Sequence, residues 1–115
     1  INKGHELANK NGVSFFMTTS PEEAVKDVDV IVTDVWASMG QEEECDKRRI
    51  DFDGYQVNKK LLTLAKEDTI VLHCLPAHRG EEITNEILEA HADTIFEEAE
   101  NRLHAQKAVL VKLLK

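Results

Sequence analysis

Short apolar runs alternate with segments of helical periodicity along this chain. Runs rich in β-branched and aromatic residues predict four short strands, at residues 13–19, 28–34, 69–74 and 93–99. Apolar residues spaced three or four positions apart predict helices at residues 55–68, 80–91 and about 102–115. Helices are also expected at residues 2–11 and 20–27, where boundary signals mark them, and over part of the charged segment 41–52. Because nearly continuous apolar strands alternate with helices, we predict a doubly wound, three-layer α/β fold whose parallel sheet is covered on both faces.

Local signals mark several helix boundaries. Ser20, Pro21 and Glu23 form the pattern of a capping box with proline at the first helical position, so a helix should begin at Pro21. Gly12 is a typical stop after the first helix. The apolar positions expected to face the core are Val57, Leu61, Leu62, Leu64 and Ala65 in one helix and Ile83, Ile87 and Leu88 in the next.

The last helix is apolar over much of its circumference. Leu103, Leu110, Val111 and Leu114 form one stripe, whereas Val109 and Leu113 lie off it. A helix with so much apolar surface has more to bury than one sheet face can cover. We therefore expect it to self-associate or to stay mobile unless another part of the protein packs on it.

Charge and cysteine content narrow the possible partners. The chain has 22 acidic and 14 basic residues and a formal net charge of −8, which argues against a nucleic-acid partner or an anionic membrane surface. No apolar run is long enough to span a bilayer. The two cysteines, Cys45 in a charged run and Cys74 after an apolar strand, do not suggest a disulfide framework. Two cysteines without a disulfide pattern favour a reducing, cytoplasmic compartment for the protein.

Chemically active residues follow the predicted strands. Asp34 ends one strand, His73 and Cys74 end another, and the polar run Glu98–Arg102 follows the apolar part of the last. In open parallel sheets, ligands bind beyond the carboxyl ends of the strands, so we expect these residues to share one edge. Each has a structural alternative: Asp34 as a turn cap, Cys74 as a buried core thiol and Arg102 as a solvated cation.

A zinc site at His73, Cys74 and His78 is the metal-binding alternative. Adjacent strand residues point to opposite faces, and no second cysteine pair supports such a site. We therefore predict no metal and no cofactor.

Three segments resemble a known enzyme family. They are "DVWASMGQEEE" (residues 34–44), "HCLP" (residues 73–76) and "EAENRLHAQKAVLVKLL" (residues 98–114), and they resemble the ornithine-binding half of the ornithine carbamoyltransferases. Aspartate carbamoyltransferases are less similar, because they lack the Ser-Met-Gly loop and carry another residue in place of the strand-end cysteine. The resemblance implies a Rossmann-like second domain of a two-domain enzyme that transfers the carbamoyl group of carbamoyl phosphate to the δ-amine of L-ornithine, giving citrulline and phosphate.

The resemblance also implies roles on the ornithine side of the site. Asp34 would hold the side-chain amine, and Cys74 would lie against the same amine. Ser38 and Met39 would meet the α-amino and α-carboxylate end. An alkylamine is protonated near neutral pH, with a pKa of about 10.4, so such a site must bind a cation and help it to lose a proton. Whether Cys74 accepts that proton or only orients the amine stays open, and no covalent intermediate on Cys74 is required.

On the donor side, the resemblance implies carbamoyl-phosphate contacts from His73, Cys74, Leu75 and Arg102. Leu75 would offer its backbone carbonyl to the amide of the donor, and Arg102 would help to polarise it. With Asp34 and Cys74, Arg102 completes the expected catalytic set. Because a fixed, unusual peptide geometry would aim the Leu75 carbonyl, we predict that the Leu75–Pro76 bond is cis.

The family's carbamoyl-phosphate domain carries a Ser-x-Arg-Thr-Arg run, and no segment of these 115 residues matches it. We therefore expect residues 1–115 to be a partial ornithine-binding domain that is inactive alone, from an enzyme that forms trimers or larger homo-oligomers. Two alternatives stay open. One is a non-catalytic amino-acid-binding α/β module. The other is a carbamoyltransferase for a related amine such as putrescine, which the Ser-Met-Gly loop disfavours because that loop suits an α-amino-acid end.

Overall fold

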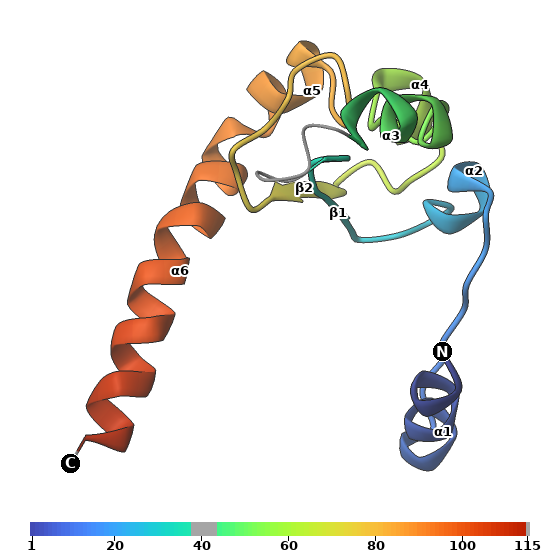
Figure 1. Cartoon of the computed structure of the whole chain (residues 1–115). Coiled ribbons are helices and arrows are strands. Elements are labelled where there is room, and N and C mark those ends of the chain that lie inside the picture. The colour runs from blue at the N-terminus through green and yellow to red at the C-terminus, as the bar shows by residue number, and fades with distance from the viewer. Residues whose placement is uncertain (38–43, 115) are drawn as a thin grey trace.

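Two parallel strands, β1 (Val30–Thr33) and β2 (Ile70–His73), lie at the centre of the computed structural model, which describes residues 1–37 and 44–114 (Figure 1). Their register pairs Val30 with Ile70 and Thr33 with His73. The residues that directly follow the two strands therefore leave the sheet side by side at its carboxyl edge. This register decides where the candidate site lies.

One face of the strand pair is buried in the core, and helix α6 (Ala92–Leu113) packs against β2 there. Ile31 and Val71 are buried on that face, Ile95 of α6 is fully buried, and the Thr94 hydroxyl donates a hydrogen bond to the Val71 carbonyl at 3.2 Å. The α/β class with a parallel sheet is confirmed. Among the described residues, however, no helix covers the second face, where the exposed side chains are those of Val30, Val32 and Ile70.

Short helices surround the strands. Helix α2 (Pro21–Ala24) begins as predicted, because the Ser20 hydroxyl accepts a hydrogen bond from the Glu23 amide at 3.2 Å. The others are α1 (Asn2–Asn11), α3 (Cys45–Asp51), α4 (Lys59–Leu62) and α5 (Asn85–Ala90). The buried core consists of Val25, Ile31, Val57, Leu61, Val71, Ile83, Ile87, Leu88 and Ile95, which confirms the inward positions predicted for 80–91.

Two predicted helices are shorter than their apolar spacing indicated. The predicted helix 55–68 forms only as α4, and that at 80–91 only as α5. The reason is backbone pairing: the Val57 amide donates to the Glu82 carbonyl at 2.8 Å, and the Thr84 amide donates to the Val57 carbonyl at 3.1 Å. These residues are extended, so neither helix can include them.

The strand predicted at residues 13–19 was wrong. This segment is an irregular, extended connection between α1 and α2 (Figure 1), and Val13, Phe16 and Met17 are exposed. β-Propensity alone does not form a strand, because an isolated segment gains no ladder hydrogen bonds or cross-strand packing. Among the described residues, no strand pairs with it.

The strand predicted at residues 93–99 was also wrong, since these residues form the first turns of α6. The apolar trio around Ile95 suggested a buried strand, but the glutamate- and alanine-rich sequence after it favours a helix. The helical residues Thr94 and Ile95 supply contacts with the sheet, one by a hydrogen bond and the other by burial of its side chain. The helix then continues without a break into the predicted C-terminal helix.

The C-terminal half of α6 extends away from the strands and is separated from α1 (Figure 1). Every described residue from 100 onward is exposed, including the whole apolar stripe predicted for this helix. None of the helices in the described ranges is both long and apolar enough to cross a bilayer.

Candidate active site

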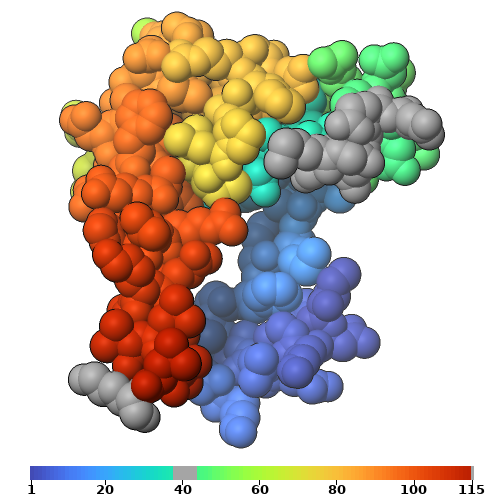
Figure 2. All heavy atoms as spheres, turned by 60° about the vertical axis from the view of Figure 1, so that its left-hand side comes forward, coloured from blue at the N-terminus to red at the C-terminus, as the bar shows by residue number. Residues whose placement is uncertain are grey.

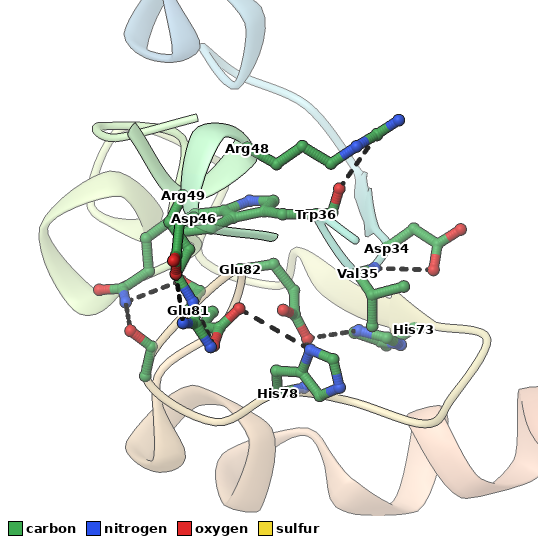
Figure 3. Close-up of polar contacts among 12 residues, drawn as sticks. Asp34, Val35, Trp36, Asp46, Arg48, Arg49, His73, His78, Glu81 and Glu82 are labelled. Atoms are coloured by element: carbon green, nitrogen blue, oxygen red, sulfur yellow. Dashed lines mark hydrogen bonds and ion pairs between the residues drawn. The ribbon is translucent and has the colours of Figure 1, made fainter. Parts of the chain in front are cut away.

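Asp34 and Cys74 meet at the carboxyl edge of the strand pair. The Cys74 thiol donates a hydrogen bond to Oδ1 of Asp34 at 3.2 Å, and both side chains are exposed. The Val35 amide donates to the same oxygen at 2.7 Å, which fixes the carboxylate at the start of the loop (Figure 3). The predicted convergence of these two residues is therefore present, and it follows from the register of β1 and β2.

The surroundings of Cys74 raise the pKa of its thiol above the ordinary value. Partial removal of water from the sulfur contributes most, followed by the hydrogen bond to Asp34 and the negative charges of Asp34 and Glu98. Cys74 is exposed, and the Asp34 carboxylate is the nearest negative charge to its sulfur. The thiol is consequently a neutral hydrogen-bond donor near neutral pH.

Arg102 reaches the same edge from helix α6. An open depression with a volume of about 380 Å³ is lined by Cys74, Glu98, Ala99, Asn101, Arg102 and Ala105. Its size falls in the range of small-molecule sites. The expectation that Arg102 lies near Cys74 is met, although a helix rather than a fourth strand carries it there.

Glu98 was predicted from sequence only as the start of the polar run that ends at Arg102, with no role of its own. It lies one helical turn before Arg102, and its Oε2 atom is buried with no hydrogen-bond partner among the described residues. Its charge contributes to the raised pKa of Cys74. Its spacing of four residues from Arg102 would have placed it on the same helix face, had the segment been recognised as helical.

Ser38 and Met39 lie outside the described residues, so their predicted contacts with an α-amino-acid end stay predictions. The residues on either side of this loop are held together, because Nη1 of Arg48 in α3 donates to the Trp36 carbonyl at 3.2 Å (Figure 3). The Trp36 ring also stacks on Phe52, with ring centroids 6.2 Å apart. The loop therefore starts next to Asp34 and ends at an anchored helix.

The Leu75–Pro76 peptide bond is cis, as predicted. Leu75 itself has a φ of 53°, in the left-handed region that costs a non-glycine residue about 1–3 kcal/mol. Its amide donates a hydrogen bond to Nδ1 of His73 at 2.9 Å. The backbone beside Cys74 is thus held in an uncommon conformation by a side chain of β2.

His73 is fully buried, and its Nε2 lies 3.0 Å from Oε1 of the equally buried Glu82 (Figure 3). Both ring nitrogens are therefore engaged, and the ring offers no surface for the predicted contact with carbamoyl phosphate. The same bonds leave no free lone pair for a metal ion, although Asp34, His73 and Cys74 bring ligand-type atoms within 4.8 Å of one another.

The whole chain up to residue 113 matches one protein family. The match is to "Aspartate/ornithine carbamoyltransferase, Asp/Orn binding domain" and covers residues 1–113. The chain belongs to this family. The range that matches the aspartate/ornithine carbamoyltransferases includes Asp34, Cys74 and Arg102, the three residues that the structure gathers at one edge.

Similar proteins in this family are named ornithine carbamoyltransferase. The chain is 57% identical over 104 residues to the protein of Caldicellulosiruptor saccharolyticus, covering 90% of this chain and 34% of that protein. It is 55% identical over 107 residues to that of Archaeoglobus fulgidus, covering 93% and 35% respectively. The chain therefore spans about a third of the length of these relatives.

Solved structures of carbamoyltransferases match the fold. The anabolic ornithine carbamoyltransferase of Campylobacter jejuni has a TM-score of 0.90 and 45% sequence identity, over 95% of this chain and 36% of that one. The enzyme of Pyrococcus furiosus has a TM-score of 0.81 and 54% identity, over 91% and 34%. The Rossmann-like α/β class predicted from the sequence is therefore confirmed.

Proposed function

We propose that residues 1–115 form part of the L-ornithine-binding domain of an ornithine carbamoyltransferase, which transfers a carbamoyl group from carbamoyl phosphate to the δ-amine of ornithine. The observation that carries this proposal is the 3.2 Å contact between Cys74 and Asp34 at the carboxyl edge of the sheet. A carboxylate and a neutral thiol side by side suit an alkylammonium group. The relatives are named ornithine carbamoyltransferase, which supports ornithine as the molecule that carries this ammonium group.

Asp34 supplies the negative charge that holds the ammonium of ornithine. Its Oδ1 already accepts hydrogen bonds from Val35 and Cys74, so the carboxylate is fixed before the ligand arrives. Cys74 orients the amine as a neutral thiol, because a raised pKa makes a thiolate base scarce near neutral pH. Ser38 and Met39 are proposed to meet the amino-acid end, since they follow Asp34 by only four and five residues in the chain.

The amine nitrogen then attacks the carbonyl carbon of the donor. A C–N bond forms and the bond from that carbon to the phosphate oxygen breaks, giving citrulline and phosphate. Of the two protons that the ammonium loses, one goes to solvent before attack and the other ends on the phosphate. Arg102 supplies positive charge where negative charge develops, and the Leu75 carbonyl accepts a hydrogen bond from the donor amide.

Two other functions are less well supported. A putrescine carbamoyltransferase would need no group for an α-amino-acid end, and a purely binding module would need no cation next to Cys74. The relatives are named for ornithine, and Arg102 lines the same depression as Cys74. The complete enzyme is further proposed to be a homo-oligomer, with a trimer implied by the resemblance.

Protection of Cys74 from alkylation tests the substrate. L-Ornithine should slow iodoacetamide labelling of Cys74 more than putrescine does, and L-norvaline, which lacks the δ-amine, should have little effect. Labelling is read peptide by peptide in a mass spectrometer, so Cys45 serves as the internal control. Equal protection by putrescine and ornithine would overturn the ornithine assignment, and no protection by either would overturn an amine site. The 115-residue chain alone is expected to form no citrulline.

A further inference from the structure

The side chains of His73 and Glu82 form a buried polar pair (Figure 3), and His73 directly precedes Cys74 and Leu75 in the chain. Neither side chain has any exposed surface. A buried pair of this type loses hydration and is often no more stabilising than apolar residues of the same size. Packing alone therefore does not account for it.

The hydrogen bonds of this pair have a definite direction. A backbone amide can only donate, so Nδ1 of His73 must be the acceptor for the Leu75 amide at 2.9 Å. The proton of the neutral ring then lies on Nε2 and is donated to Oε1 of Glu82 at 3.0 Å. Glu82 thus selects the tautomer of His73 that can hold Leu75.

Glu82 is itself anchored from two sides. Its Oε1 also accepts a hydrogen bond from the His78 amide at 2.6 Å, and its carbonyl accepts one from the Val57 amide at 2.8 Å. Val57 belongs to the buried core. A continuous set of hydrogen bonds therefore runs from the core through Glu82 and His73 to the Leu75 backbone.

We infer that Glu82 and His73 are positioning residues for the Leu75 peptide. They hold Leu75 in its left-handed conformation beside Cys74, so that its carbonyl can accept a hydrogen bond from the amide of the carbamoyl donor. The identity of the ligand, a carbamoyl donor, rests on the proposed function. The hydrogen bonds that link Glu82, His73 and Leu75 do not depend on it. His73 acts through Leu75, and this role replaces the direct contact with carbamoyl phosphate predicted from sequence.

Nuclear magnetic resonance of the isotope-labelled chain tests whether Glu82 and His73 hold the Leu75 amide. Long-range proton–nitrogen correlations should show His73 with a proton on Nε2 and none on Nδ1. Glu82→Leu removes the acceptor, so amide exchange at Leu75 should accelerate by about tenfold or more relative to Ile70. The Ile70 amide, which donates to the Asp29 carbonyl at 3.1 Å, reports whether β2 is still intact.

Two further variants separate positioning from mere stability. Glu82→Gln keeps an acceptor for Nε2 and should retain both the tautomer and the slow exchange of Leu75. Glu81→Gln weakens the partly exposed pairs of Glu81 with Arg49 and His78, keeps the hydrogen bond from the His78 amide to Glu82, and should leave both the tautomer and the exchange unchanged. Unchanged Leu75 exchange in a folded Glu82→Leu chain would overturn the inference. A His73 ring protonated on Nδ1 in the unsubstituted chain would also overturn it, and that spectrum needs no variant to fold.

Ornithine protection of Cys74 in the same samples distinguishes this inference from the proposed function. Because Cys74 lies between His73 and Leu75, the ornithine concentration for half protection should rise by about tenfold in Glu82→Leu and change little in Glu82→Gln. His73 could show the expected tautomer and Leu75 the expected amide exchange while ornithine fails to protect Cys74. That result would contradict the proposed function and leave the positioning role of Glu82 and His73 intact. Protection that is normal in all the variants would contradict the positioning role alone.

Discussion

At the scale of single residues, the contact between Asp34 and Cys74 sets the chemistry of the site. Asp34→Asn removes the negative charge while keeping a similar shape, so the pKa of the Cys74 thiol should fall toward its ordinary value. More thiolate will then be present near neutral pH. The rate of Cys74 alkylation, followed by peptide mass spectrometry over a range of pH, should therefore be several-fold higher in the variant.

The control for this substitution is Asp51→Asn, which changes an exposed carboxylate on α3. It should leave the pH dependence of Cys74 alkylation unchanged. Identical pH profiles for Asp34→Asn and the unsubstituted chain would show that Asp34 does not govern the thiol.

Residues at the site were predictable where strand register alone determines their position. Asp34 and Cys74 each follow a strand directly, so parallel pairing brings them together without any further information. Arg102 was placed at the right edge for the wrong reason, since a helix carries it. The role of His73 was not predictable. It depends on a buried contact between its ring and the Glu82 carboxylate, and Glu82 lies nine residues later in the chain.

At the scale of elements, α6 is attached to the sheet through its first turns. Ile95 is fully buried against β2, whereas Leu113 on the same helix is 74% exposed. Ile95→Ala should lower the free energy of unfolding by about 2–5 kcal/mol, because it removes buried methyl groups and leaves a cavity. Urea unfolding followed by circular dichroism measures this difference.

The matched control is Leu113→Ala, which truncates an exposed side chain near the end of α6. We expect it to change the free energy of unfolding by no more than about 0.5 kcal/mol. Equal effects of the two substitutions would mean that the C-terminal half of the helix is packed in solution.

Strands were predictable where pairing supports them and not elsewhere. The segments around β1 and β2 have apolar runs that pair with each other, and both were found. Residues 13–19 have a similar composition but no partner strand among the described residues, so they stay irregular. Amino-acid composition indicates the tendency of a segment to form a strand, but the strand forms only where a second strand pairs with it.

At the scale of the whole molecule, the most consequential feature is the C-terminal half of α6, drawn in red in Figure 2, because its apolar side chains are exposed. Leu103, Val109, Leu110, Val111, Leu113 and Leu114 are all more than half exposed. Exposed apolar patches of this kind drive association in water. Static light scattering should therefore show an average mass that increases with protein concentration.

Leu110→Glu places a charge within this surface and should shift association to higher concentration. Because Leu110 is exposed and lies far along α6 from the strands, the substitution should leave the unfolding transition nearly unchanged. A constant monomer mass for the unsubstituted chain at every concentration would show that this surface does not self-associate.

The central claim is that Asp34 binds the side-chain ammonium of ornithine beside Cys74. Calorimetric titration of the chain with L-ornithine, in parallel with Asp34→Asn and Asp51→Asn, tests it most directly. Loss of a charge-assisted hydrogen bond should weaken ornithine binding by about tenfold to a hundredfold in Asp34→Asn, and Asp51→Asn should bind as the unsubstituted chain does. Equal affinity of Asp34→Asn and the unsubstituted chain for ornithine would contradict the account.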